Sequence, residues 1–252
     1  MLLILHHAAP RVQAGKKKLI FTSNLPAPLN LPELKKEVAA VKKLSGETDT
    51  AIVDGTSFSI MRQALRDNAT VNSVLMAMHF DLQVKVDGSD AFLYTPAMMN
   101  SKAVADIKKN LTPNHHGFDK AALETYTVET YTDKVLLDDI IELFEQYSVK
   151  NGGSLVEIFL NGCNSNGLGY SLGKLGFVVV CWSTRVRDDA ASKFSRAYYY
   201  ARNKNGMPFH QAFEFAKEAI SNEFELRDPD APVVGPVSSK PAAGDPKLVL
   251  PW

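Results

Sequence analysis

With 252 residues, 45% of them hydrophobic, the chain is long enough to bury a sizeable core without disulfides or a structural metal. Its 28 basic and 28 acidic residues cancel, so the composition gives no support for a nucleic-acid or membrane-surface partner. The two cysteines, Cys163 and Cys181, form no CxxC or His-spaced pattern, which argues against a zinc site and a disulfide framework. We therefore expect an intracellular protein of a reducing compartment, with no metal and no cofactor.

Residues 1–17 are expected to form an extension before the fold. The acid-free stretch 1–32 includes Arg11 and the lysines at 16–18, a composition compatible with organelle targeting. An ordinary extension is the alternative, because the apolar stretch 1–5 is too short for a secretory signal. No apolar run in the sequence approaches the length that spans a bilayer.

The first part of the chain alternates strands and helices. Apolar runs predict strands at 18–24, 50–53 and 71–80. Between them, one amphipathic helix ends at Gly46, and a second begins after a cap at Thr56 or Ser57. This alternation favours a parallel sheet with right-handed crossovers.

The alternation of strands and helices weakens over residues 81–132, which are predicted to be an enlarged insertion after the third strand. Two alternating segments on either side of Asp87 and Gly88 predict a hairpin, and a helix is expected at 97–111. His115 and His116 follow in a loop.

Alternation resumes in the second part of the chain. Strands are predicted at 155–160 and 177–182, with helices at 136–147, 170–175 and 188–204 and a last helix opened by Pro208. Residues 227–246 then form a Pro-rich linker to an edge strand at 247–250. We expect one α/β domain over residues 18–252, with a mainly parallel sheet of about six strands.

The central strand ends in Asn161, Gly162, Cys163, Asn164 and Ser165, at the sheet edge where open α/β folds bind ligands. A thiolate of Cys163 there would be stabilised by loop amides, and the N–H groups near Gly162 could bind an oxyanion. The alternative is a small buried hydrophobic residue, which is also what we expect of mid-strand Cys181.

A thiol nucleophile needs a base, usually a histidine that the fold brings close. His79 ends the third strand at the same sheet edge as Cys163, although a strand-end histidine with satisfied nitrogens is the alternative. His115 and His116 are loop candidates, and His210, near a helix start, is expected at the surface.

Several segments together resemble the CHAT branch of the caspase-like cysteine peptidases. They are the segment 160–165, the strand 177–182, the segments 186–191, 194–199 and 209–220, the first strand and helix, and His79-Phe80. The resemblance covers nearly the whole chain from residue 18 and implies a three-layer αβα sandwich with Cys163 as the nucleophile.

In that family the third strand ends in a pattern of the type His-Phe-x-Gly-His-Gly, whose second histidine is the base. Alignment on His79-Phe80 puts Gln83 at the base position, and glutamine cannot accept a thiol proton. In some relatives an acid at the place of Asp188 lines a pocket for a basic side chain, which a carboxylate would select. From the residues alone, Asp188 or Asp189 could instead cap the helix 188–204.

The sequence therefore predicts a catalytically degenerate caspase-like protein, a pseudoenzyme that binds a protein or peptide as a regulatory module or a subunit of a larger assembly. The alternative is an active cysteine endopeptidase that uses Cys163, a base from His79 or the pair His115 and His116, and Asp188 to favour a basic residue. A flavodoxin-like nucleotide-binding domain also fits the alternation, but a Pro-rich loop stands where a phosphate-binding glycine loop would be.

Overall fold

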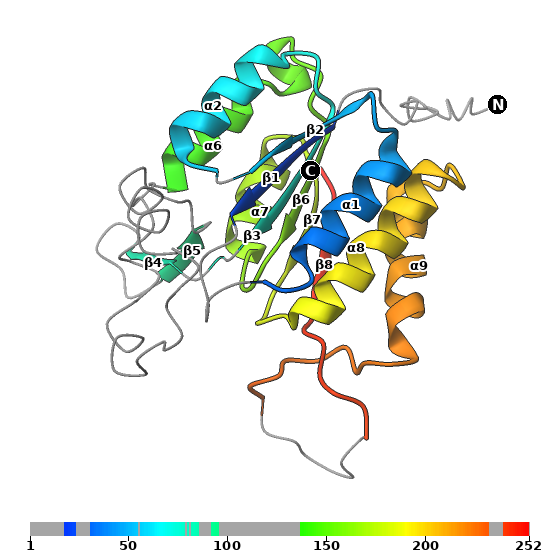
Figure 1. Cartoon of the computed structure of the whole chain (residues 1–252). Helices are drawn as coiled ribbons and strands as arrows, with labels where there is room; N and C mark the ends of the chain where they lie inside the picture. Colours follow the sequence, from blue (N-terminus) through cyan, green and yellow to red (C-terminus); the bar gives the residue numbers. More distant parts are fainter. Residues whose placement is uncertain are drawn as a thin grey trace, which may run out of the picture.

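Six strands form the central sheet of the computed structural model (Figure 1), in the order β2-β1-β3-β6-β7-β8. The model describes residues 18–23, 31–54, 56–78, 80, 82–85, 92–95, 137–231 and 239–251. The strands are β1 (Lys18–Ser23), β2 (Thr50–Val53), β3 (Ser73–Met78), β6 (Glu157–Asn161), β7 (Val178–Trp182) and β8 (Pro246–Val249). The first five run parallel and β8 is antiparallel to β7, as expected of a mainly parallel sheet with a returning edge strand.

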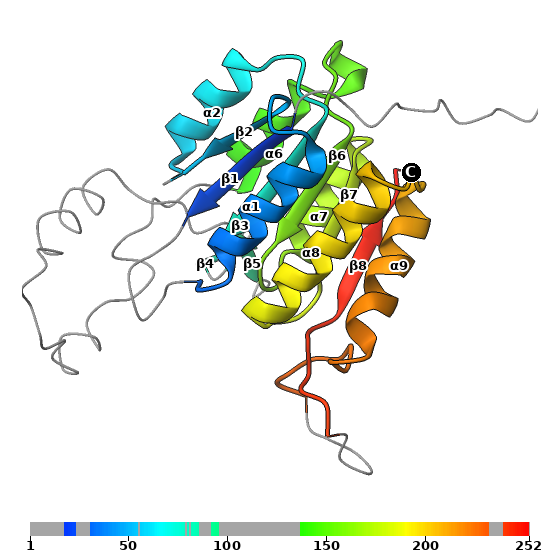
Figure 2. The ribbon, with the colours of Figure 1, turned by 45° about the vertical axis from the view of Figure 1, so that its right-hand side comes forward.

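Helices cover both faces of this sheet (Figure 2). One face packs against α2 (Phe58–Asp67), α6 (Leu137–Glu145) and α7 (Asn166–Lys174), and the other against α1 (Leu34–Ser45), α8 (Asp188–Asn203) and α9 (Phe209–Ser221). Because strand side chains alternate, Leu19 and Phe21 join the first apolar cluster and Ile20 the second. The predicted α/β fold is therefore confirmed, with helices in two outer layers.

The predicted elements differ from the structure mainly at α7. The sequence placed this helix at 170–175, because Gly167 and Gly169 resemble turn residues, but it begins at Asn166. A Cβ on Gly169 would come 2.7 Å from the sulfur of Cys181. This glycine thus allows α7 to pack closely on β7 and does not mark a turn.

The predicted hairpin is present as a separate sheet. β4 (Leu82–Lys85) pairs antiparallel with β5 (Phe92–Thr95), and Gln83 lies opposite Tyr94. The helix predicted at 97–111 lies outside the described residues.

The ends of the predicted linker are tied together. The Glu225 carbonyl accepts from the Ala243 N–H at 2.8 Å, and the Gly244 N–H donates to the Arg227 carbonyl at 3.0 Å, just before β8 begins.

A short 3₁₀ turn (Val149–Asn151) connects α6 to β6. No helix in the described part of the chain combines the length and apolar character needed to cross a membrane.

Candidate functional site

A small pocket opens where β3 and β6 end, between the amino-terminal turns of α1 and α8. Its volume is about 60 Å³, several times the ~10–15 Å³ that one water molecule needs. It is lined by Leu31, Leu34, Glu37, Ala77, Met78, Asn161, Gly162, Cys163, Val186, Asp188 and Ala191. The described lining residues thus carry a thiol and two carboxyl groups, and none of them is basic.

Cys163 lies in the tight turn after β6, as predicted, and is partly exposed. The turn is closed by Asn164, whose φ of 52° is in the left-handed region. The Val186 N–H donates to the sulfur at 3.4 Å, and the thiol faces the Val186 carbonyl at 3.7 Å. The N–H contact favours a thiolate, whereas the carbonyl accepts from the thiol and favours the neutral form, so the two contacts act in opposite directions.

Gly162 is required by a close approach of β6 to the end of β3. A Cβ at this position would come 2.2 Å from the Met78 carbonyl oxygen and 2.4 Å from the ring of Phe80. These two residues are the sequence neighbours of His79, which is outside the described residues. The backbone before Cys163 therefore touches both covalent neighbours of the predicted base.

Asp188 performs a structural role different from the predicted one. It is the first residue of α8, and its Oδ2 accepts from the Glu33 N–H at 2.8 Å, at the amino terminus of α1. Asp189 lies in the first turn of α8 and its Oδ1 accepts from the Ala190 N–H at 2.9 Å, but the N-cap residue is Arg187 and no described side chain caps the helix, so the predicted acidic cap is wrong. Asp188 thus joins two helices while it also lines the pocket beside Cys163.

Glu37 is a pocket residue that the sequence did not predict. It is 3% exposed, and its Oε1 accepts from the Asn161 amide at 2.7 Å. Burial raises the pKa of Glu37 to about 7; hydrogen bonds with Ser195 and Asn161 oppose this rise, and the charge of Asp188 adds to it. The available signal was a carboxylate on the apolar face of a predicted amphipathic helix, one turn after Leu34.

Three predicted histidines, His79, His115 and His116, lie outside the described residues. Gln83 is described only as a backbone position in β4. No group of three or more His, Cys, Asp or Glu residues that could hold a metal ion occurs in the described part of the chain.

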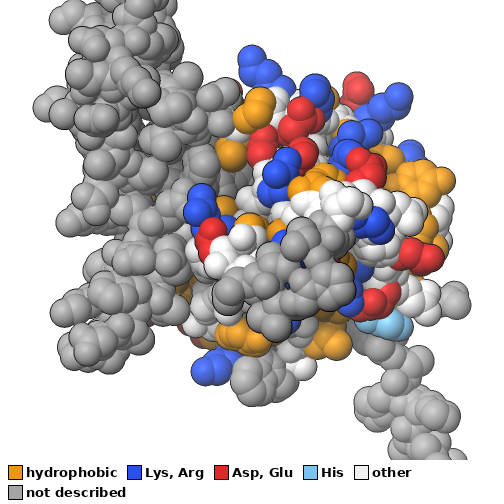
Figure 3. Space-filling model, turned by 90° about the horizontal axis from the view of Figure 1, so that it is seen from below, with side chains coloured by type: hydrophobic (Ala, Val, Ile, Leu, Met, Phe, Trp, Pro, Cys, Tyr) orange, Lys and Arg blue, Asp and Glu red, His pale blue; other side chains and the backbone are white. Residues whose placement is uncertain are grey.

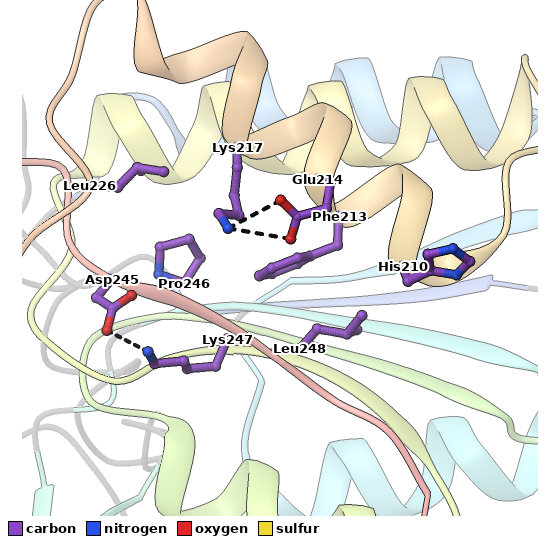
Figure 4. Close-up of a pocket in the computed structure, with 9 residues that line it drawn as sticks. All are labelled: His210, Phe213, Glu214, Lys217, Leu226, Asp245, Pro246, Lys247 and Leu248. Atoms are coloured by element: carbon purple, nitrogen blue, oxygen red, sulfur yellow. Dashed lines mark hydrogen bonds and ion pairs between the residues drawn. The ribbon is translucent and has the colours of Figure 1, made fainter.

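A larger hollow of about 540 Å³ lies between α9 and β8 (Figure 4). Its charged groups pair within the chain, Lys217 with Glu214 at 3.1 Å and Lys247 with Asp245 at 2.7 Å. His210, in the first turn of α9, lines this hollow and is exposed, so the prediction of a surface position is confirmed. Its described lining contains no cysteine or serine, which makes the pocket at Cys163 the better candidate for chemistry.

On the face that Figure 3 shows, basic and acidic side chains intermingle among the described residues. No protein-family model and no curated protein matches this sequence. The geometry of the pocket is therefore the main indication of function.

Proposed function

We propose that the chain is a catalytically degenerate caspase-like protein of the CHAT type that recognises a basic side chain of a protein or peptide. The observation that carries the proposal is the pocket that places the carboxyl groups of Asp188 and Glu37 beside Cys163. A cation in such a half-buried carboxylate site forms charge-assisted hydrogen bonds, which are about twice as strong as neutral ones. The protein would act as a regulatory module or as a subunit of a larger assembly.

The fold supports the resemblance on which this proposal depends. A sheet of five parallel strands with an antiparallel edge strand lies between two helical layers, and Cys163 follows its central strand β6. Gln83, the residue that aligns with the family's base, follows β3 in the separate hairpin. Without a base at that position, the pocket keeps recognition while hydrolysis is lost.

The size of the pocket sets the kind of ligand. About 60 Å³ accommodates the ammonium or guanidinium end of one side chain, with the aliphatic stem in the opening beside Leu31 and Leu34. A nucleotide or a second folded domain would not enter it. The partner is therefore a protein or peptide that presents a single exposed Lys or Arg.

Fluorescence anisotropy with labelled peptides tests this recognition. Peptides containing one Arg should bind at least tenfold more tightly than the same peptides with citrulline, which is neutral and of similar shape. D188N should reduce this preference without abolishing it, since Asn still accepts from Glu33 but carries no charge, while Glu37 remains in the pocket. D189N, at the neighbouring residue that does not line the pocket, should behave as wild type. Equal binding of Arg and citrulline peptides would contradict the proposal.

An active cysteine endopeptidase is the second candidate, and two contacts favour it. The Val186 N–H donates to the sulfur of the partly exposed Cys163 at 3.4 Å, and Gly162 lies close to Met78 and Phe80, the sequence neighbours of His79. In this mechanism the thiolate attacks the carbonyl carbon of a basic residue, and loop N–H groups bind the oxyanion. The amine leaves with a proton from the base, and water then hydrolyses the thioester.

A peptidyl acyloxymethyl ketone that ends in Arg separates the two candidates. The peptidase should be labelled at neutral pH, and C163A should abolish labelling whereas C181A should not, because Cys181 is fully buried. H79A should slow labelling if His79 is the base. Absence of labelling, together with specific binding of Arg peptides, would favour the degenerate protein.

A further inference from the structure

Glu37 is the only charged residue among the buried residues of α1. Its neighbours on that face are Leu34, Val38 and Val41, which pack into the apolar cluster beneath α8 and α9. Burying a carboxyl group in such surroundings is costly unless its hydrogen bonds are satisfied. The structure satisfies them with partners that also fix the direction of the group.

A chain of hydrogen bonds holds the Glu37 carboxyl at the pocket. The Trp182 indole N–H donates to Asn161 Oδ1 at 2.9 Å, and the Asn161 amide donates to Glu37 Oε1 at 2.7 Å and to the Ala191 carbonyl at 3.3 Å. Asn161 and Trp182 are both buried, so this arrangement is preorganised by the ends of β6 and β7. Unlike a surface glutamate, Glu37 has no freedom to turn to solvent.

We propose that Glu37 determines the specificity of this pocket, because its carboxyl, more deeply buried than that of Asp188, pairs with the cationic end of the bound side chain and gives up its proton to do so. This inference rests on the proposed function and adds the residue that makes binding depend on pH. Asp188 is held by the backbone of α1, whereas the hydrogen-bond partners of Glu37 are neutral side chains. An incoming cation would therefore be the first positive group next to Glu37 among the described pocket residues.

The sign of the pH effect follows from the groups around Glu37. Among the described residues, the titratable groups near it are Asp188 and Tyr199 of α8 and the Cys163 thiol in the same pocket, and the lining residues from β3 and β6 are uncharged. Burial raises the pKa of Glu37 to about 7, so the carboxyl is mostly protonated at pH 6 and mostly ionised at pH 8. Binding of a cation should thus strengthen about tenfold from pH 6 to pH 8. A ligand that prefers the neutral carboxylic acid would show the opposite dependence.

Isothermal titration calorimetry with the Arg peptide measures this proton directly. At pH 7, in phosphate and in Tris, which differ in ionisation enthalpy, wild type should release about half a proton per bound peptide. E37Q keeps an acceptor for Asn161 but should release almost none, bind about ten- to hundredfold more weakly at pH 8 and lose the pH dependence. E33Q removes a partly exposed carboxylate that precedes α1 and pairs with Lys36 at 2.7 Å, and it should match wild type.

Three further results would overturn the inference. If wild type binds the Arg peptide without proton release and E37Q binds equally well, Glu37 has no role, although the proposed function stands. If the released proton disappears in C163A and persists in E37Q, the proton comes from the thiol. If wild type binds no Arg peptide at any pH, both proposals fail. The wild-type titration decides the point even if E37Q does not fold.

Discussion

The two ends of the central sheet both bury charged groups, but they do so in different ways. At the amino ends, Lys18, Thr50, Ser73 and Glu157 begin neighbouring strands and lie side by side in register. Glu157 accepts from Ser73 Oγ at 2.8 Å and from the Tyr198 hydroxyl at 2.6 Å. At the carboxyl ends, Glu37 has neutral partners and lines a pocket.

Cations complete the cluster at the amino ends. Arg202 Nε lies 3.8 Å from Glu157 Oε1, and the ammonium of Lys18 lies 3.4 Å from the centre of the Tyr199 ring. Burial lowers the pKa of Lys18 to about 8, the Glu157 charge opposes this, and Arg202 adds to it. Buried charge alone therefore does not identify a site. What distinguishes the pocket is a buried carboxyl group with no basic residue among its described lining residues.

Removal of Glu157 should have the largest effect on this comparison. E157A leaves Arg202 and Lys18 buried without a carboxylate, which should reduce the free energy of unfolding by about 3–5 kcal/mol. Urea unfolding monitored by tryptophan fluorescence measures it. E142A, at an exposed position of α6, should change stability by less than about 0.5 kcal/mol. A similarly small loss in E157A would mean that Glu157 does not stabilise the buried Arg202 and Lys18.

A substitution at Gly162 tests how closely the ends of β3 and β6 approach each other at the pocket. In G162A the new methyl group would meet the Met78 carbonyl and Phe80, so we expect a loss of roughly 2–3 kcal/mol in the same assay. G206A provides the matched control, because Gly206 has a φ of +65° but open space around it. Its backbone strain alone should cost about 1 kcal/mol. Equal losses in the two variants would contradict the close approach.

Neutralising Glu37 should raise the free energy of unfolding, whereas removing Glu157 should lower it. The folded-state pKa of Glu37, about 7, lies above its ordinary value of 4.5, so wild-type stability should fall as pH rises between these values and level off above 7. E37Q should therefore be more stable than wild type by up to about 3 kcal/mol at pH 8 and nearly equally stable near pH 4.5. Unfolding curves at several pH values measure this difference. A destabilised E37Q at pH 8 would show that Glu37 is balanced inside the protein, as Glu157 is.

The smallest expected effect is a difference in reactivity between the thiols of Cys163 and Cys181. Cys163 is partly exposed, whereas Cys181 is fully buried and burial raises its pKa to about 12. Titration with Ellman's reagent at pH 8 should therefore modify one thiol in the native protein and two after unfolding. C163A should remove the native reaction and C181A should leave it unchanged. Two rapidly reacting native thiols would indicate that α7 does not cover β7 as described.

Periodicity predicted most of the fold because the apolar residues that bury each element are local in sequence. The spacing of Leu34, Val38 and Val41 predicted α1, and the pattern around Cys163 predicted the end of the central strand. The role of Glu37 could not be predicted in this way, because its partner Asn161 is 124 positions away in sequence. Likewise, a local capping rule assigned Asp188 to its own helix, whereas the fold brings Glu33 to it from 155 positions away.

The bond from Asp188 to the first turn of α1 has a consequence for how such a protein changes during evolution. An acid that holds two helices together is retained by selection for folding, whether or not a substrate is ever cleaved. A peptidase that loses its base would then keep the negative charge beside its former nucleophile without further selection for it. A pocket maintained by the architecture in this way is a ready starting point for a binding protein.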